Sequence, residues 1–332
     1  MDLIREKARY SIPLNYENQL RSLCWLDDYL VDYAGGLATF HLNGIQTHSK
    51  VSFGGLFDNA ITTADGKYTV IYQTLGTKAL LLKEQKILRE LNRSYYCAEA
   101  FEYPITFLTI QDEICIAHCP DEYNVIEIEE IETGTRLTAK ERLSHDFFQS
   151  RLQMSPNHKM LLSAGWIWQP IDAIELYDLS ESVSNPQILS PFFNKNFENI
   201  NLWEINNAVF IGDKRLLLSG TGDFGNEDAS EEISIVVYDL ETQTVSSRAK
   251  IQERTGFLMP LDESSAIGFY EYPKVYDLGS GEIVHKWSDI PTDKRNSSIL
   301  WHINEVSKIA IDRNFKRFAV GTRNTIEVVV LE

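Results

Sequence analysis

The sequence has few of the features that mark a secreted or membrane-bound protein. Its 332 residues include only four cysteines, and their spacing does not suggest a disulfide framework. It has no apolar run of the roughly 18 to 20 residues that a membrane-spanning helix needs. The first residues alternate in charge where a secretory signal would be apolar. We therefore expect a cytoplasmic protein with reduced thiols and no membrane contact.

Basic residues are also scarce. The chain has 31 lysines and arginines against 48 acidic residues, a net charge of −17. Between Arg93 and Arg136 there are ten acids and no base, and between Arg215 and Arg248 there are seven acids and no base. Nucleic acid is disfavoured as a partner, because binding it requires cations that neutralise phosphates. This distribution predicts an acidic arc on one side of the protein, which would attract a basic protein. The alternative is that the negative charge serves only to keep the protein soluble.

The usual signatures of catalysis are missing. There is no G-x-S-x-G elbow, no H-E-x-x-H pair and no Walker lysine. The segment Gly220–Gly225 matches G-x-G-x-x-G and follows an expected strand, but an acidic stretch follows it instead of a helix. We expect no catalytic residues and no cofactor. Paired carboxylates are numerous enough that a glycosidase or lyase stays open.

Two further segments resemble metal sites. Cys115 and Cys119 flank His118, but residues four apart on a strand lie about 13 Å apart, and His118 faces the other side. The acidic stretch from Asp223 to Glu232 lacks the spacing of an EF-hand. We expect no metal, with buried structural cysteines in the first segment and a solvated loop in the second.

A repeated pattern of turns and apolar runs governs the chain. A polar turn is followed by a buried strand seven times. These strands are expected at 29–33, 68–72, 114–118, 160–164, 216–220, 266–270 and 318–322. A third strand follows each, with its best copies at 174–179, 235–240 and 274–278. Between the outermost copies, near Phe40 and Val329, lie 289 residues in six intervals of about 48, the period of a four-stranded propeller blade.

The last repeat ends after its third strand, because the chain stops at Glu332. The segment Arg5–Ile12 precedes the first repeat and has no other evident partner. We therefore expect it to complete the last blade and close the ring, which leaves no open sheet edge. The expected fold is an all-β, seven-bladed β-propeller with four antiparallel strands per blade, forming one domain over residues 1–332.

With this organisation the chain resembles the WD40 family of seven-bladed propellers. The Tyr-Asp pairs beginning at Tyr177, Tyr238 and Tyr276 stand where that family has Trp-Asp, and Ser155–Lys159 resembles its first hairpin turn. Neither His145 nor His302 is preceded by the glycine that the family places there. The resemblance implies the propeller fold, while function transfers poorly between proteins that share a fold.

Aromatic residues are predicted to gather on one face of the ring. The connections between second and third strands and between blades should share that face, and the tight turns should share the other. Trp166 and Trp168 are the best candidates for partner contact, because alternation along a strand places both indoles on one side. The alternative is that long connections fold back and bury their own aromatics. The candidate partner-binding residues are Tyr123, Trp166, Trp168, Asp223, Phe224, Tyr270 and Tyr272.

These observations favour a non-catalytic scaffold that binds a basic protein partner. It would use its acidic arc and the face that carries the long connections, which we call the long-loop face. One version neutralises a basic enzyme or toxin, and another serves as an assembly platform. A propeller enzyme or lectin that acts on carbohydrate at the same aromatic rim is the alternative. The sequence predicts neither the identity of the partner nor the oligomeric state.

Overall fold

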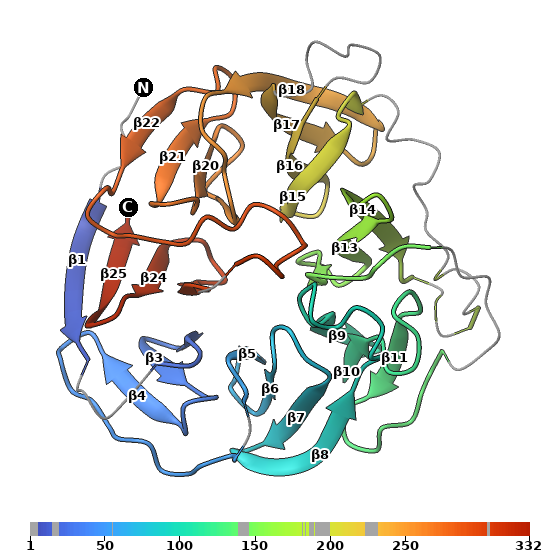
Figure 1. Cartoon of the computed structure of the whole chain (residues 1–332), viewed down its shortest axis with the longest axis vertical. Coiled ribbons are helices and arrows are strands. Elements are labelled where there is room, and N and C mark those ends of the chain that lie inside the picture. The colour runs from blue at the N-terminus through green and yellow to red at the C-terminus, as the bar shows by residue number, and fades with distance from the viewer. Residues whose placement is uncertain are drawn as a thin grey trace.

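The computed structural model places seven antiparallel sheets in a ring (Figure 1). It describes residues 6–14, 20–54, 56–138, 146–180, 182, 184–185, 189, 200–222, 232–303 and 306–332. The number of blades and the order of strands confirm the predicted propeller. Four sheets have four strands and three have three among the described residues.

Each blade is built from consecutive strands. Blade 1 contains β2 (Cys24–Leu26), β3 (Tyr29–Asp32) and β4 (Ala38–His41), and blade 2 contains β5 (Asn59–Thr62), β6 (Tyr68–Tyr72), β7 (Lys78–Lys83) and β8 (Lys86–Asn92). Blade 3 contains β9 (Ile105–Ile110), β10 (Glu113–His118) and β11 (Glu127–Glu130), and blade 4 contains β12 (Gln153–Met154), β13 (Met160–Ile167) and β14 (Ile171–Asp178). Blade 5 contains β15 (Glu204–Ile211), β16 (Arg215–Thr221), β17 (Ile233–Asp239) and β18 (Thr244–Ile251), and blade 6 contains β19 (Leu258–Pro260), β20 (Ser265–Gly268), β21 (Lys274–Asp277) and β22 (Ile283–Lys286). Blade 7 contains β23 (Lys308–Ile311), β24 (Arg317–Gly321), β25 (Thr325–Leu331) and β1 (Glu6–Pro13).

The two ends of the chain meet in blade 7, as predicted. β1 pairs antiparallel with β25 from Glu6 opposite Leu331 to Pro13 opposite Thr325. Figure 1 shows β1 beside β25 at the outer edge of this blade. This pairing covers the hydrogen-bonding edge that β25 would otherwise expose.

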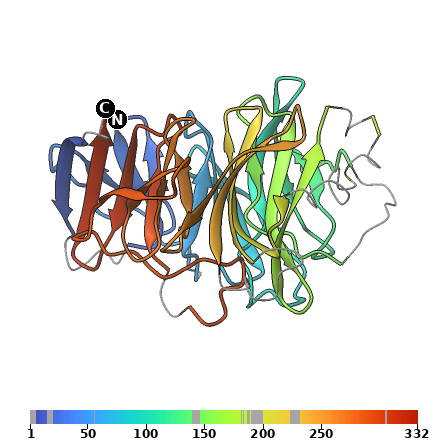
Figure 2. The same cartoon turned by 90° about the horizontal axis from the view of Figure 1, so that it is seen from above.

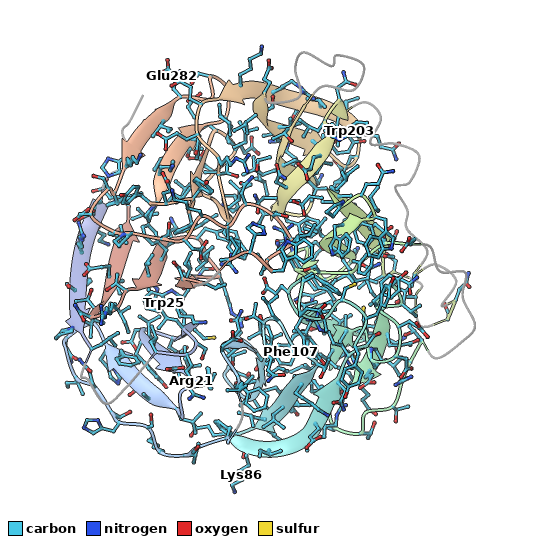
Figure 3. The ribbon with its side chains drawn as sticks, in the orientation of Figure 1. Arg21, Trp25, Lys86, Phe107, Trp203 and Glu282 are labelled. Atoms are coloured by element: carbon cyan, nitrogen blue, oxygen red, sulfur yellow. The ribbon has the colours of Figure 1, made fainter. Side chains whose placement is uncertain are left out.

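The core lies between neighbouring blades, because each sheet packs one face against the next. The second and third strands of a blade are buried on both faces, and all five residues of β6 are buried. Leu162 and Leu176 of blade 4, for example, share a cluster with Leu216 and Val236 of blade 5. The outer strands alternate instead, and side chains such as that of Lys86 point away from the ring (Figure 3).

The connections define two faces. The turns from first to second strand, such as the one between β9 and β10, lie on the tight-turn face. The links from second to third strand and those between blades lie on the opposite, long-loop face. The C-terminal end of the chain lies on one face, and the orange-red connection after β22 projects from the other (Figure 2).

The connection after β22 crosses the centre of the ring (Figure 1). We call residues 288–303 the strap. Ser298 of the strap donates its backbone N–H to Oδ1 of the buried Asp172 in blade 4, at 2.8 Å. Asn296 accepts a hydrogen bond from the side chain of Asn207 in blade 5, at 3.2 Å. These buried bonds hold the strap against blades on the far side of the ring.

The described part of the chain contains no helix long and apolar enough to cross a membrane.

Candidate interaction face

An aromatic cluster forms on the long-loop face, where blades 3 and 4 meet. Phe148, in the connection that enters blade 4, forms an isolated bridge with Trp166 of β13. Their rings stack 3.7 Å apart at an interplanar angle of 11°. Trp168 contacts Trp166 edge-on at 5.2 Å, so both indoles lie on the same side, as strand alternation predicts. Such aromatic pairs add to the free energy gained from burial alone.

The two tryptophans differ in exposure. Trp166 is only 3% exposed, whereas Trp168 is 46% exposed. Trp166 therefore supports the surface from below, and Trp168 presents its indole to solvent. Trp166 is thus an aromatic that its own connection buries, which was the alternative expectation. Trp168 lies at the surface, as expected for an aromatic rim.

Tyr123 belongs to the same cluster. Its ring stacks on Phe148 at 4.3 Å, and its hydroxyl donates a 2.7 Å hydrogen bond to Asp146. Burial, together with the carboxylate of Asp146, raises the pKa of Tyr123. The tyrosine is therefore held neutral and in a fixed orientation at the edge of the cluster.

The other predicted residues lie elsewhere. Tyr270 and Tyr272 are half-buried in the link between β20 and β21, in blade 6. The ammonium of Lys274 lies 5.8 Å from the ring centre of Tyr270, and that of Lys286 lies 5.3 Å from the ring centre of Tyr272. Both rings therefore already contact cations of the chain itself. Asp223 and Phe224 lie outside the described residues.

The strap adds a residue that the sequence analysis missed. The backbone N–H of Leu300 donates a 2.6 Å hydrogen bond to the carbonyl of Ala100, and Ile299 forms an isolated antiparallel β-bridge with Phe101. Trp301 follows directly and is 71% exposed. Its flanking sequence has no periodic pattern, so only the course of the strap reveals its place. We define the aromatic patch as the exposed residues Tyr95, Tyr96, Trp168 and Trp301. The rings of Tyr96 and Trp168 contact the buried ring of Phe148. Tyr95 adjoins Tyr96 in the chain, and Trp301 adjoins Leu300, which is bonded to Ala100.

The exposed acids between Arg93 and Arg136 lie on both faces of the ring. Glu99, Asp121 and Glu122 are exposed in connections of the long-loop face, near the aromatic patch. Asp112 and Glu113 are exposed at the tight turn between β9 and β10, on the opposite face. The buried acids of this segment are Glu102, Glu127 and Glu129.

Glu129 is the most densely paired of these acids. Its carboxylate lies 2.8 Å from Nη1 of Arg89, 3.2 Å from Nε2 of His118 and 3.4 Å from Nε of Arg136. Burial alone would raise the pKa of Glu129, but His118 and Arg89 outweigh it and lower the pKa to about 2. Because Arg89 lies on β8, this buried acid joins blade 3 to blade 2.

The cysteines are the remaining candidate ligands and nucleophiles. None of the four forms a disulfide, and Cys115 and Cys119 are buried. Burial raises the pKa of the Cys115 thiol to about 11, which keeps it protonated. Within the described ranges, no three histidine, cysteine or acidic side chains gather as metal ligands would.

Comparison with known proteins identifies the fold alone. No protein-family model matches the sequence, and no curated protein is detectably similar to it. Among solved structures, one of the mitotic checkpoint complex has a TM-score of 0.61 at 11% identity, covering 98% of this chain and 94% of that one. Hydrazine synthase of Kuenenia stuttgartiensis has a TM-score of 0.58 at 9% identity, covering 94% and 96%.

The computationally designed protein Ika8 has a TM-score of 0.53 at 8% identity, with 97% of this chain and 100% of that one covered. Identities this low carry no information on activity or partners. The chain is a seven-bladed β-propeller.

Proposed function

We propose that the protein is a non-catalytic scaffold that binds a basic protein partner at the aromatic patch on its long-loop face. The observation that carries this proposal is the exposed indole of Trp168, held edge-on against Phe148 and Trp166. A ring already fixed by its neighbours loses little conformational freedom on binding, which is a property of aromatic hot spots.

Cation–π contacts supply the preference for a basic partner. The rings of Tyr96 and Trp168 lie 6.4 Å apart, and both are nearly half exposed. An arginine or lysine of the partner placed over such a ring gains about 0.5–2 kcal/mol, depending on how far water is excluded. The apolar rings supply contact area, and the cation supplies selectivity.

Carboxylates beside the patch strengthen the same preference. Glu99 and Glu122 are exposed in the connections that also carry Tyr96 and Tyr123. Because like charges would be repelled and cations attracted, these acids should accelerate encounter with a basic protein and reject acidic ones. Binding should weaken at moderate salt, since exposed charges are screened within about 10 Å at 0.1 M.

We also infer a distant kinship with the WD40 propellers. Tyr177, Tyr238 and Tyr276 lie in β14, β17 and β21, the third strands of their blades, and each is followed by aspartate. In blade 4 the first hairpin turn begins at Ser155, whose hydroxyl accepts a hydrogen bond from the backbone of Met160. These residues support the kinship, and no partner is inferred from it.

The experiment is affinity capture from native lysate with the wild-type chain and two variants. Trp168→Ala removes the exposed indole. Ile87→Ala is the matched control, because Ile87 is 57% exposed but lies on outer strand β8, away from the patch. We expect a stoichiometric basic partner that binds the wild type and the control, is released by salt, and is lost with Trp168→Ala.

A partner retained equally by all three chains would contradict the proposed surface. A glycan array tests the carbohydrate alternative, because an exposed tryptophan beside carboxylates also suits sugar binding. Saturable glycan binding that Trp168→Ala abolishes would replace the protein partner with a carbohydrate ligand.

A further inference from the structure

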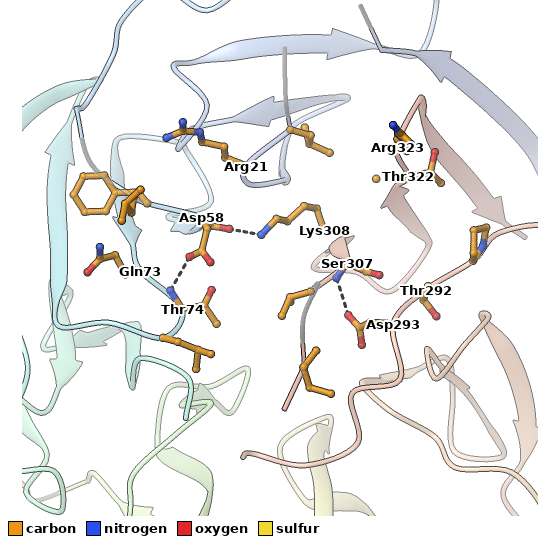
Figure 4. A pocket seen from close by; sticks show the side chains of 18 of the residues that line it. Arg21, Asp58, Gln73, Thr74, Thr292, Asp293, Ser307, Lys308, Thr322 and Arg323 are labelled. Atoms are coloured by element: carbon orange, nitrogen blue, oxygen red, sulfur yellow. Dashed lines mark hydrogen bonds between the residues drawn. The ribbon is translucent and has the colours of Figure 1, made fainter. Parts of the chain in front are cut away.

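A second site lies on the long-loop face, beside the strap. A cavity of about 860 Å³ opens between the strap and blades 1, 2 and 7 (Figure 4). Its apolar wall includes Leu14, Leu20, Leu56, Phe57, Leu75 and Val306. A cavity of this size and character holds a small molecule or a short chain end.

Charged side chains of both signs line this cavity. Its described lining holds three cationic side chains, Arg21, Lys308 and Arg323, and two carboxylates. Both carboxylates already accept hydrogen bonds from the backbone. Asp58 accepts from Thr74 N and Asp293 from Ser307 N, each at 2.7 Å (Figure 4). The carboxylate of Asp293 also lies 3.8 Å from Nη2 of Arg295, so both carboxylates are engaged by groups other than Lys308.

Lys308 is the central cation. Its Nζ donates to the backbone carbonyl of Asp58 at 2.5 Å, and no described carboxylate lies within ion-pair distance of it. Burial lowers the pKa of Lys308, because its ammonium has lost water without gaining a full counter-charge. An anion that enters the cavity would restore that counter-charge.

A hydroxyl group at the cavity also lacks a partner. Thr74 is 1% exposed and lines the cavity, and its Oγ1 has no hydrogen-bond partner among the described residues. A buried polar group without a partner costs about 1–3 kcal/mol. This oxygen is closed to solvent, so the unpaired hydroxyl belongs to the wall of the cavity rather than to its ligand contacts.

We propose that this cavity binds a carboxylate attached to an apolar group, with Lys308 facing the carboxylate and the leucine-rich wall covering the apolar part. The ammonium of Lys308, which has no ion-pair partner among the described residues, matches one carboxylate, and the exposed Arg323 at the rim attracts it. The source is either a small free acid or the C-terminus of a peptide that ends in an apolar residue. This site is separate from the aromatic patch and does not depend on the proposed function.

Calorimetric titration of the intact protein tests the proposal. The probes are hexanoate, 4-phenylbutyrate and two forms of a short peptide ending in Leu-Leu, one with a free C-terminus and one amidated. We expect saturable binding of at least one free carboxylate and none of the amidated peptide. A preference for hexanoate or phenylbutyrate identifies a small acid, and a preference for the free peptide identifies a chain end.

Three charge variants locate the binding. Lys308→Gln should weaken it about tenfold or more, since it removes the buried counter-charge. Arg323→Gln should also weaken it, and because Arg323 is exposed this variant does not threaten the fold. Lys316→Gln is the control, an exposed lysine of the same blade at the turn between β23 and β24. Equal affinity in all three variants, or no saturable binding of any probe, would overturn the proposal.

Discussion

The indole N–H of Trp287 donates a 2.8 Å hydrogen bond to the carboxylate of Glu6, which joins the end of blade 6 to the first strand of the chain. Three residues along β1, Arg9 forms a 2.7 Å ion pair with Asp289, at the start of the strap. The N-terminal strand thus contacts the next blade as well as its own sheet. Closure of the ring and placement of the strap depend on the same segment.

Removing residues 1–12 should lower the melting temperature sharply. The deletion takes away nearly all of the pairing between β1 and β25, and with it the contacts of Glu6 and Arg9. The loss of several hydrogen bonds at about 1 kcal/mol each should lower the melting temperature by about 10 °C. Differential scanning calorimetry measures it.

The matched control removes only residues 1–5, which precede β1. Its melting temperature should stay near that of the full chain. An unchanged melting temperature in the longer deletion would show that β1 does not close the ring.

The two neighbouring tryptophans should respond differently to truncation. Trp166→Ala opens a space within the buried stack and should cost about 3–5 kcal/mol of unfolding free energy. Trp168→Ala removes a half-exposed ring and should cost less than about 1 kcal/mol. Urea unfolding of both variants measures the difference. Equal losses would mean that Trp168 is a core residue, and its use as a binding surface would fail.

Gly165 precedes Trp166 in β13 and permits a close backbone approach. A Cβ atom at this position would lie 1.9 Å from the carbonyl oxygen of Phe148. Gly165→Ala should therefore push the connection that carries Phe148 away from β13, at a cost of about 1–3 kcal/mol. Near-ultraviolet circular dichroism of the aromatic cluster should change with it. An unaltered spectrum and stability would contradict the packing described here.

The lowered pKa of Glu129 should make the free energy of unfolding fall at acidic pH. Because its pKa is lowered in the folded state, the stabilisation it provides is complete above its ordinary pKa of 4.5 and is lost as the pH falls toward 2. Glu129→Gln should be less stable near neutrality and should lose less of its remaining stability between pH 4.5 and 2. Urea midpoints across that range measure this. Glu122→Gln, at an exposed position, should keep the wild-type acid dependence.

The architecture could be predicted because it repeats. The buried strand expected at 68–72 coincides with β6, and that expected at 216–220 falls within β16. Hydrophobic alternation and turn residues are local signals, and seven copies reinforce one another. The closing strand could be predicted for a related reason, since the last repeat lacked its fourth strand.

The long-loop face was less predictable, because irregular connections are fixed by contacts distant in sequence. The hydrogen bond from Ser298 to Asp172 joins residues 126 positions apart, and no local pattern announces it. Alternation correctly placed Trp166 and Trp168 on one side. It did not indicate that Phe148 would stack on Trp166 and leave only Trp168 exposed.

The most direct test of the proposed function is hydrogen–deuterium exchange of the protein with and without its captured partner. We predict slower exchange in segments 95–101 and 166–170, which carry Tyr96 and Trp168, and unchanged exchange in the tight turn at 111–113. Protection confined to the tight-turn face, with the aromatic patch unaffected, would contradict the account.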